Sequence, residues 1–342
     1  MAPATMIRPP VTGAAMVHGG QLEAARRQFP EAPLPLIDLS TGINPIAYPL
    51  PALPAACFTR LPESEAVLYL ERIAAEAYGA ADPATVAAAP GTQILIDLLP
   101  RLLALPSVAV LGPTYAEHAA AWARTGSAVS DITSLADLGD ERALVVCNPN
   151  NPDGRIIAPA VLHALADRLA SRGGYLVVDE AFADLITPDI SLASALPHPA
   201  IVVLRSFGKT YGLAGVRLGF AIASCPLTTI IRAALGPWAV SGPAITIGST
   251  ALADRNWLTQ TRQRLDHEVR MLDAHLGRAG LPVIGGTSLF RLAAAPTAPE
   301  WYARLGHAGI IIRRFETAPE WLRFGIPGTA TAWSRLNLAL KG

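Results

Sequence analysis

The stretch SFGKTYGLAGVR, residues 206–217, places Lys209 directly after a glycine and eight residues before Arg217. It follows a short apolar run, and a similar run further upstream ends in Asp179-Glu180. Runs this short and apolar, bounded by turn residues, are typical of strands buried in a parallel sheet. Because ligands bind beyond the carboxyl ends of such strands, the pattern predicts an open α/β fold with a lysine in its binding site.

Helical and extended segments alternate from about residue 65 onward. Helices are predicted at 65–78, 92–105, 159–171, 256–278 and the chain end, and strands at 108–111, 144–147, 175–178, 201–204, 289–292 and 310–313. This alternation favours right-handed crossovers and a mostly parallel sheet that helices cover on both faces. We expect a large domain at 47–235 and a smaller α/β domain formed by 1–46 together with 236–342.

Composition excludes several classes of protein. The chain carries 27 basic and 27 acidic residues, so no net field favours nucleic acid or an anionic membrane as a partner. The uncharged stretch 233–253 is interrupted by prolines and glycines, which favours a buried loop over a membrane span. The first 16 residues lack the apolar core of a signal peptide. The three cysteines lie far apart without metal-ligand spacing, so we expect reduced thiols, no metal and a cytoplasmic protein.

Polar residues follow several of the predicted strands. Asp179, the segment 148–151, Ser206 and Tyr115 each come just after a short apolar run. Since the carboxyl ends of parallel strands meet at one edge of a sheet, these residues are expected to converge there.

Lys209 and Asp179 fit the first two requirements of pyridoxal phosphate. The cofactor needs a lysine amine for a Schiff base, and the other lysine of the chain, Lys341, lies at its end. It also needs an anion facing the pyridine nitrogen, and Asp179 at the end of a buried strand fits that role. The alternatives are a solvated surface lysine and an aspartate that caps a helix or forms an ion pair.

The phosphate and the ring of such a cofactor need further partners. The segment Gly91-Thr92-Gln93 begins a predicted helix, and its backbone N–H groups could bind a phosphate. Ser206 and Arg217 would add side-chain contacts to that phosphate. Two residues are expected to contact the ring: Tyr115 by stacking on it, and Asn151 by donating to its 3-oxygen. The alternatives are an ordinary half-buried tyrosine and, for the Asn-Pro repeats, plain turns.

The order of these motifs resembles fold-type I pyridoxal-phosphate enzymes of the aspartate aminotransferase superfamily. Within it the chain looks most like the histidinol-phosphate aminotransferase branch, and it is most similar to the threonine-phosphate decarboxylases of cobalamin biosynthesis. Three features favour the decarboxylases: His18-Gly19 resembles their His-Gly-Gly segment over the active site, Asn44 lies in an Ile-Asn-Pro segment that closes on substrate, and Phe182 replaces a common tyrosine. A flexible N-terminal residue is the alternative for His18.

The resemblance also implies how the substrate binds. Arg323 resembles the arginine that grips the α-carboxylate, and Arg313 the arginine that receives the substrate phosphate, with Arg314 as a less favoured substitute. The implied reaction is decarboxylation of L-threonine O-3-phosphate to (R)-1-amino-2-propanol O-2-phosphate, which would make the chain a carbon–carbon lyase. Asp179, Lys209 and Tyr115 are its predicted catalytic residues.

One position departs from the family pattern. Related aminotransferases have a tyrosine, where this chain has Leu61, that reaches the cofactor of the neighbouring subunit; Tyr48 is the substitute we consider. The resemblance implies a homodimer with active sites at the subunit interface. The alternatives are a histidinol-phosphate or other amino-acid aminotransferase, and a non-catalytic binding protein built on the same fold.

Overall fold

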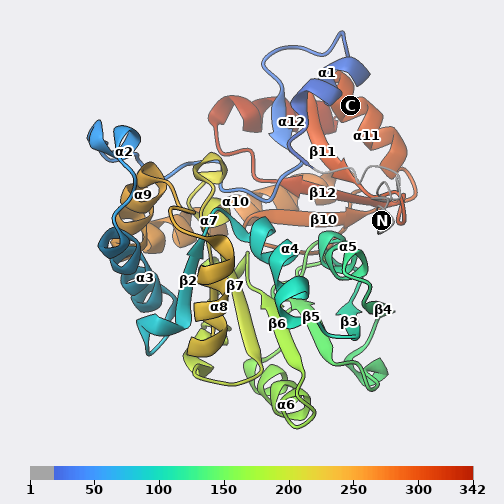
Figure 1. The fold of residues 1–342 in the computed structure, drawn as a ribbon. Coiled ribbons are helices and arrows are strands. Elements are labelled where there is room, and N and C mark those ends of the chain that lie inside the picture. Colours follow the sequence, from blue (N-terminus) through green and yellow to red (C-terminus); the bar gives the residue numbers. More distant parts are fainter. Residues whose placement is uncertain (1–18, 342) are drawn as a thin grey trace, which may run out of the picture.

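Two β-sheets organise the chain (Figure 1). The computed structural model describes residues 19–341. The larger sheet has the strand order β2-β8-β7-β6-β5-β3-β4, with bounds β2 (Val86–Ala89), β3 (Ser107–Leu111), β4 (Ala128–Ile132), β5 (Ala143–Cys147), β6 (Tyr175–Asp179), β7 (Ile201–Ser206) and β8 (Gly219–Ala223). Strand β8 is antiparallel to both neighbours and the other pairs are parallel. The predicted α/β fold with a mostly parallel sheet is confirmed.

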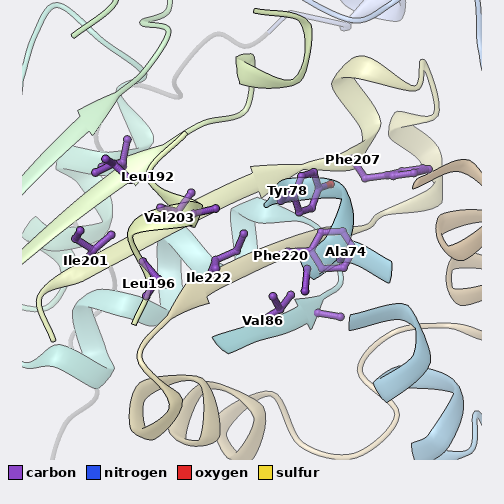
Figure 2. Close-up of a cluster of buried hydrophobic side chains, with 14 of the residues drawn as sticks. Ala74, Tyr78, Val86, Leu192, Leu196, Ile201, Val203, Phe207, Phe220 and Ile222 are labelled. Atoms are coloured by element: carbon purple, nitrogen blue, oxygen red, sulfur yellow. The ribbon is translucent and has the colours of Figure 1, made fainter. Parts of the chain in front are cut away.

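Helices cover both faces of this sheet because its strands bury side chains on both. Val203 of β7 belongs to an apolar cluster with α3, α6 and α9, whereas its neighbours Val202 and Leu204 belong to a cluster with α4, α5 and α8. Figure 2 shows Val203 in the first cluster. The helices are α2 (Ala56–Thr59), α3 (Ser64–Tyr78), α4 (Thr92–Leu103), α5 (Glu117–Arg124), α6 (Pro159–Ala170), α7 (Phe207–Thr210), α8 (Cys225–Leu235) and α9 (Gly242–Ala253).

The smaller sheet has the order β1-β11-β12-β10-β9 and forms a separate layer above the first in Figure 1. Its strands are β1 (Ile37–Leu39), β9 (Val283–Thr287), β10 (Phe290–Ala294), β11 (Ile310–Arg314) and β12 (Trp321–Gly325), and its helices are α1 (Leu22–Gln28), α10 (Arg255–Arg278), α11 (Ala298–His307) and α12 (Ala330–Lys341). β1 pairs with β11 in parallel, so the N-terminal segment completes a sheet made mainly by the C-terminal part.

The structure corrects one expectation from the sequence. The uncharged stretch 233–253 is not a buried loop throughout, because 242–253 form the helix α9, which packs on α3. Ser241 caps this helix and Pro243 lies in its first turn, where proline is favoured. Since α9 belongs to the core of the larger sheet, we propose that the domain boundary lies near the start of α10 rather than at 235.

Within residues 19–341, no helix combines the length and the apolar character needed to cross a membrane.

Candidate active site

Lys209 lies in α7, which begins directly where β7 ends. Its Nζ is 5.8 Å from the ring centroid of Phe182, the residue that follows β6 closely in sequence. Burial, the guanidinium of Arg323 and the guanidinium of Arg217 lower the pKa of Lys209 to about 8, against an opposing effect of Asp179. The structure thus brings together four residues that the sequence predicted for one site. Asp179 lies at the end of β6 and Lys209 just after β7, whereas Arg323 lies within β12 and Arg217 in the loop before β8.

A cavity of about 50 Å³ lies beside this lysine. It is lined by Gly91, Thr92, Ser206, Gly208, Lys209, Ala214, Arg217 and Leu218. Thr92 begins α4, whose first turn presents N–H groups and the positive end of the helix dipole. A hydroxyl, a guanidinium and a helix N-terminus around one small cavity are the donor set of a phosphate site.

A glycine is required at position 91 for the guanidinium of Arg217 to line this cavity. The φ of Gly91 is +88°, and a Cβ built on it would lie 2.6 Å from Nη2 of Arg217. A larger residue would therefore be strained and would displace the guanidinium that lines the cavity. The residues present fit the phosphate of pyridoxal phosphate.

Asp179 is held by two partners at the end of β6. Its Oδ2 lies 2.9 Å from Nε2 of His118, and its Oδ1 accepts a hydrogen bond from the backbone N–H of Ala181. Although burial alone lowers the pKa of His118, the charges and hydrogen bonds of Cys147 and Asp179 raise it to about 10. The hydrogen bond from His118 fixes the position of the Asp179 carboxyl group at the end of β6, where a pyridine nitrogen would meet it.

His118 and Cys147 lie at the site but were not predicted from the sequence as site residues. A ring nitrogen of His118, the sulfur of Cys147 and a carboxylate oxygen of Asp179 all lie within 4.8 Å of one another. His118 stands 61 positions from Asp179 in the chain, so nothing local linked them. The available signal was that His118 comes three residues after Tyr115 and Cys147 is the last residue of a predicted strand.

Tyr115 is oriented by Gln93. Its hydroxyl donates to Oε1 of Gln93 over 3.1 Å, and Nε2 of Gln93 donates to Asp97 over 3.3 Å. Burial raises the pKa of Tyr115 to about 12, so the phenol stays protonated. The ring of Tyr115 meets that of His118 edge to face, with centroids 6.0 Å apart. Gln93 as a direct cofactor ligand stays a prediction.

Two arginines of the smaller sheet face the same region. Arg313 of β11 and Arg323 of β12 are partners in the strand register. Arg323 donates to Oδ1 of Asn151 over 2.5 Å and to the carbonyl of Ser40 over 2.7 Å. Among the described residues, Nε of Arg323 and Nη1 of Arg313 are buried without a hydrogen-bond partner.

These two guanidinium groups destabilise each other. Burial and the charge of Arg313 lower the pKa of Arg323 to about 10, and burial also lowers the pKa of Arg313. Like charges kept close in a partly desolvated place, with unused N–H groups, indicate an anionic ligand. Arg314, the substitute considered for Arg313, is exposed and stacks on Tyr302 at 4.8 Å.

The N-terminal segment reaches this site beside Ser40. The N–H of Gly20 donates to Oγ of Ser40 over 2.8 Å, and the carbonyl of the same Ser40 accepts from Arg323. Gly19 lies against Ser40 as well. His18 lies outside the described residues, so its predicted role is untouched by the structure.

Asn44 is buried, and both the nitrogen and the oxygen of its carboxamide are hydrogen-bonded within the protein. Its Nδ2 donates to the carbonyl of Thr210, and its Oδ1 accepts from the N–H of Ile46 and from Arg264. The side chain is therefore committed to the backbone beside Lys209, and a direct contact with substrate stays a prediction.

Tyr48 does not replace the intersubunit tyrosine. It is buried in its own chain, where its hydroxyl bonds Asp254 over 3.2 Å and its ring packs edge to face on Tyr211 and Trp257. Leu61, at the position in question, is 63% exposed. The substitute proposed from sequence was wrong, because Tyr48 belongs to an aromatic cluster.

A lysine directly after β7, an aspartate at the end of β6 and a phosphate cradle at a helix start define a fold-type I pyridoxal-phosphate enzyme. The chain belongs to the aminotransferase class I and II family, whose model matches residues 58–335.

Several relatives refine this assignment. Threonine-phosphate decarboxylases from Pseudomonas aeruginosa and Sinorhizobium sp share 44% and 45% identity, over 95% and 96% of this chain and 97% and 98% of theirs. A histidinol-phosphate aminotransferase from Sinorhizobium meliloti, solved in complex with pyridoxal-5'-phosphate, superposes with a TM-score of 0.81 at 20% identity, over 98% of this chain and 97% of its own.

Gly91→Ala should weaken cofactor binding. The new Cβ would push Arg217 out of the cavity and strain the turn, so we expect the affinity for pyridoxal phosphate to fall at least tenfold, a loss of about 1.4 kcal/mol. Spectroscopic titration of the cofactor-free protein measures this. Gly215→Ala is the matched control, since a Cβ there meets nothing within 4 Å. Equal affinities of the two variants would contradict the assignment of the cavity.

Lys209→Met should stabilise the cofactor-free protein below pH 8. Lys209 has a folded-state pKa of about 8 against an ordinary lysine pKa of 10.5, so the unfolded chain binds the proton more tightly. Stability therefore rises with pH between about 8 and 10.5, and below that range the buried charge costs about 3 kcal/mol. Urea unfolding at pH 7 and pH 10.5 should show a gain for the variant that shrinks at the higher pH. Lys341→Met, at an exposed position, should show neither.

Proposed function

We propose that this chain decarboxylates L-threonine O-3-phosphate to (R)-1-amino-2-propanol O-2-phosphate, with pyridoxal phosphate as its cofactor. The observation that carries the proposal is the pair Arg313 and Arg323. Arg323 is buried and Arg313 half-buried, and each keeps a buried N–H group without a partner, whereas this substrate has two anionic groups to neutralise. The relatives of 44% and 45% identity bear the name of this activity and span nearly the whole chain.

The residues divide the work as follows. Lys209 would hold the cofactor covalently, and Gly91, Thr92, Ser206 and Arg217 would hold its phosphate. Asp179, held in place by His118, would face the pyridine nitrogen. When bound, pyridoxal phosphate supplies the electron sink for the pair of electrons that carbon dioxide leaves behind.

Tyr115 and Asn151 would contact the ring. The hydroxyl of Tyr115 donates to Oε1 of Gln93, which fixes the orientation of the ring that would stack on the cofactor. Oδ1 of Asn151 accepts from Arg323, so its amide N–H groups point away from that arginine and are available to an oxygen acceptor. One side chain thus links the cofactor site to the carboxylate site.

Arg323 and Arg313 would orient the substrate. Arg323 is anchored at Asn151 and Ser40 and keeps Nε for the carboxylate, and Arg313 would take the phosphate. The bond that breaks must stand perpendicular to the cofactor plane, so fixing both ends of a small substrate decides which bond that is. Nζ of Lys209, with a pKa of about 8, is the group that we propose returns a proton to the α-carbon.

We also infer a cytoplasmic homodimer that acts in cobalamin biosynthesis. The free thiols of Cys57, Cys147 and Cys225 support a reducing compartment. The exposed apolar side chains of Phe58, Leu61, Leu68 and Tyr69 on and between α2 and α3 support a second subunit on that face. Light scattering of the purified protein, for which we expect twice the 35.8 kDa chain mass, tests the dimer.

Incubation with L-threonine O-3-phosphate tests the function directly. We expect release of carbon dioxide and formation of an amino alcohol phosphate without any 2-oxo acid. A reaction that instead requires 2-oxoglutarate and consumes histidinol phosphate would replace the proposal with an aminotransferase. If neither substrate reacts and borohydride fails to fix saturating cofactor to Lys209, the chain is a non-catalytic member of the fold.

Arg313→Met should selectively weaken binding of the substrate phosphate. Charge-assisted hydrogen bonds contribute about 1.5–3 kcal/mol, so we expect KM for threonine phosphate to rise about 10- to 150-fold, with a smaller change in kcat. The neighbouring Arg314→Met is the matched control, because that side chain is exposed and stacks on Tyr302. If the effect on KM at Arg314 equals or exceeds the effect at Arg313, the assignment of the phosphate site to Arg313 is contradicted.

A further inference from the structure

Residues 44–48, here called the strap, cross the helix that carries the predicted cofactor lysine. The N–H of Asn44 donates to the carbonyl of Lys209 over 2.9 Å, and the N–H of Tyr48 donates to the carbonyl of Tyr211 over 2.8 Å. The crossing is close: a Cβ on Gly212, whose φ is +64°, would lie 2.6 Å from the carbonyl oxygen of Asn44. The strap therefore satisfies carbonyl groups on α7 and just after it, which a four-residue helix cannot satisfy itself.

The strap is in turn held by α10. Nη2 of Arg264 donates to Oδ1 of Asn44 over 2.7 Å, while Nη1 of the same arginine lies 3.2 Å from both carboxylate oxygens of Glu268. At the other end of the strap the hydroxyl of Tyr48 bonds Asp254, the cap of α10. Glu268 thus fixes the guanidinium, and the guanidinium fixes the Asn44 side chain.

The carboxamide of Asn44 can hold only one orientation in this arrangement. Its oxygen accepts from Arg264 and from the N–H of Ile46, so its nitrogen is directed to the carbonyl of Thr210, 2.8 Å away. Rotating the amide would break three hydrogen bonds in a buried place. Arg264 consequently determines where the Asn44 amide points.

We propose that Arg264 is a positioning residue for Lys209, acting through Asn44. The chain of contacts runs from Glu268 through Arg264 and Asn44 to the carbonyl groups of Lys209 and Thr210. Arg264 itself belongs to α10, whose later turns pack on the smaller sheet, so the lysine is positioned by both parts of the molecule. The effect of Arg264 on catalysis rests on the proposed function, whereas the hydrogen bonds that connect Arg264 to Lys209 do not depend on it.

Small shifts of α7 matter because of what surrounds the amine. The charged groups that act on Lys209 are Arg323 from β12, Arg217 after the turn 214–216, and Asp179 from β6. The two arginines and burial favour the neutral amine and Asp179 opposes them. If the helix relaxes toward water, burial lessens first, and the pKa of the amine moves back toward 10.5.

Competitive acetylation of the cofactor-free protein tests the positioning directly. The chain has two lysines, so Lys341, which is exposed, serves as an internal reference for Lys209. Acetic anhydride labelling across pH 6–11, read by mass spectrometry, gives the titration midpoint of each amine. For Arg264→Met we expect the Lys209 midpoint to rise by about one pH unit, which is tenfold in proton affinity. Arg270→Met, at an exposed position six residues along α10, is the control and should leave it in place.

Steady-state kinetics with threonine phosphate give the second readout. We expect Arg264→Met to lower kcat about tenfold and to change KM less than twofold, because misplacement of the amine affects the reacting atoms rather than the anion site. Asn44→Ala should show a similar loss. The double variant should lose no more than the larger single loss, since both substitutions cut one chain of contacts.

The outcomes separate this proposal from the proposed function. The labelling needs neither cofactor nor substrate, so a shifted midpoint supports the positioning role even if the chain catalyses another reaction. A Lys209 midpoint in Arg264→Met equal to that in Arg270→Met, or fully additive kinetic losses in the double variant, would overturn it. Thermal unfolding checks that each variant is folded. If Arg264→Met does not fold, Arg264→Gln is judged by the same criteria.

Discussion

A buried lysine amine with two guanidinium groups near it is the constraint on which this site depends. Burial lowers the pKa of Lys209, and the charges of Arg323 and Arg217 lower it further. Burying the amine and Arg323 without a full complement of anions costs stability in the protein alone. We propose that ligands offset this cost: a phosphate beside Arg217, a carboxylate beside Arg323, and covalent use of the amine. Relief of the repulsion would then contribute to the binding energy of those ligands.

The two sheets supply different halves of this arrangement. The larger sheet provides the lysine, the aspartate and the phosphate cradle, all at strand ends or helix starts, where backbone geometry is fixed. The smaller sheet provides Arg313 and Arg323 on neighbouring antiparallel strands. The hydrogen bond from Arg323 to Asn151, which follows β5, crosses between the two parts, whereas its bond to Ser40 anchors the guanidinium beside β1 of the smaller sheet. A substrate that spans both must match their separation, which favours a short molecule with two anionic ends.

The sequence carried the local part of this design and not the long-range part. Lys209, Asp179, Gly91 and Arg217 could be found because each sits in a motif whose chemistry is written within a few residues. His118 could not, since its contact with Asp179 joins a helix start to a strand end 61 residues away. Tyr48 was misjudged for the same reason: its aromatic partners, Tyr211 and Trp257, lie more than 160 positions further along.

The prediction of secondary structure was wrong where turn-forming residues and helix-forming contacts occur in the same stretch. In 233–253 the prolines and glycines suggested a loop, yet Pro243 lies in the first turn of α9, where it breaks no hydrogen bond, and Gly248 faces Leu218 and Leu70, where a Cβ would not fit. Both residues serve helix start and packing rather than chain reversal. Tertiary contact decides such cases.

The choice between decarboxylation and transamination depends on the same contacts, not on the cofactor. Both reactions would use the roles that we propose for Lys209, Asp179 and an arginine at the carboxylate, so those residues define only the class. The structure adds that Phe182 puts an apolar ring close to Lys209 and packs edge to face on Phe290, with centroids 5.1 Å apart. It also places the guanidinium of Arg323 5.0 Å from the centroid of that same Phe290 ring. An arginine backed by an aromatic ring and anchored at two oxygens can rotate little, so the proposed contact with a carboxylate would have its direction set by the protein before the substrate arrives.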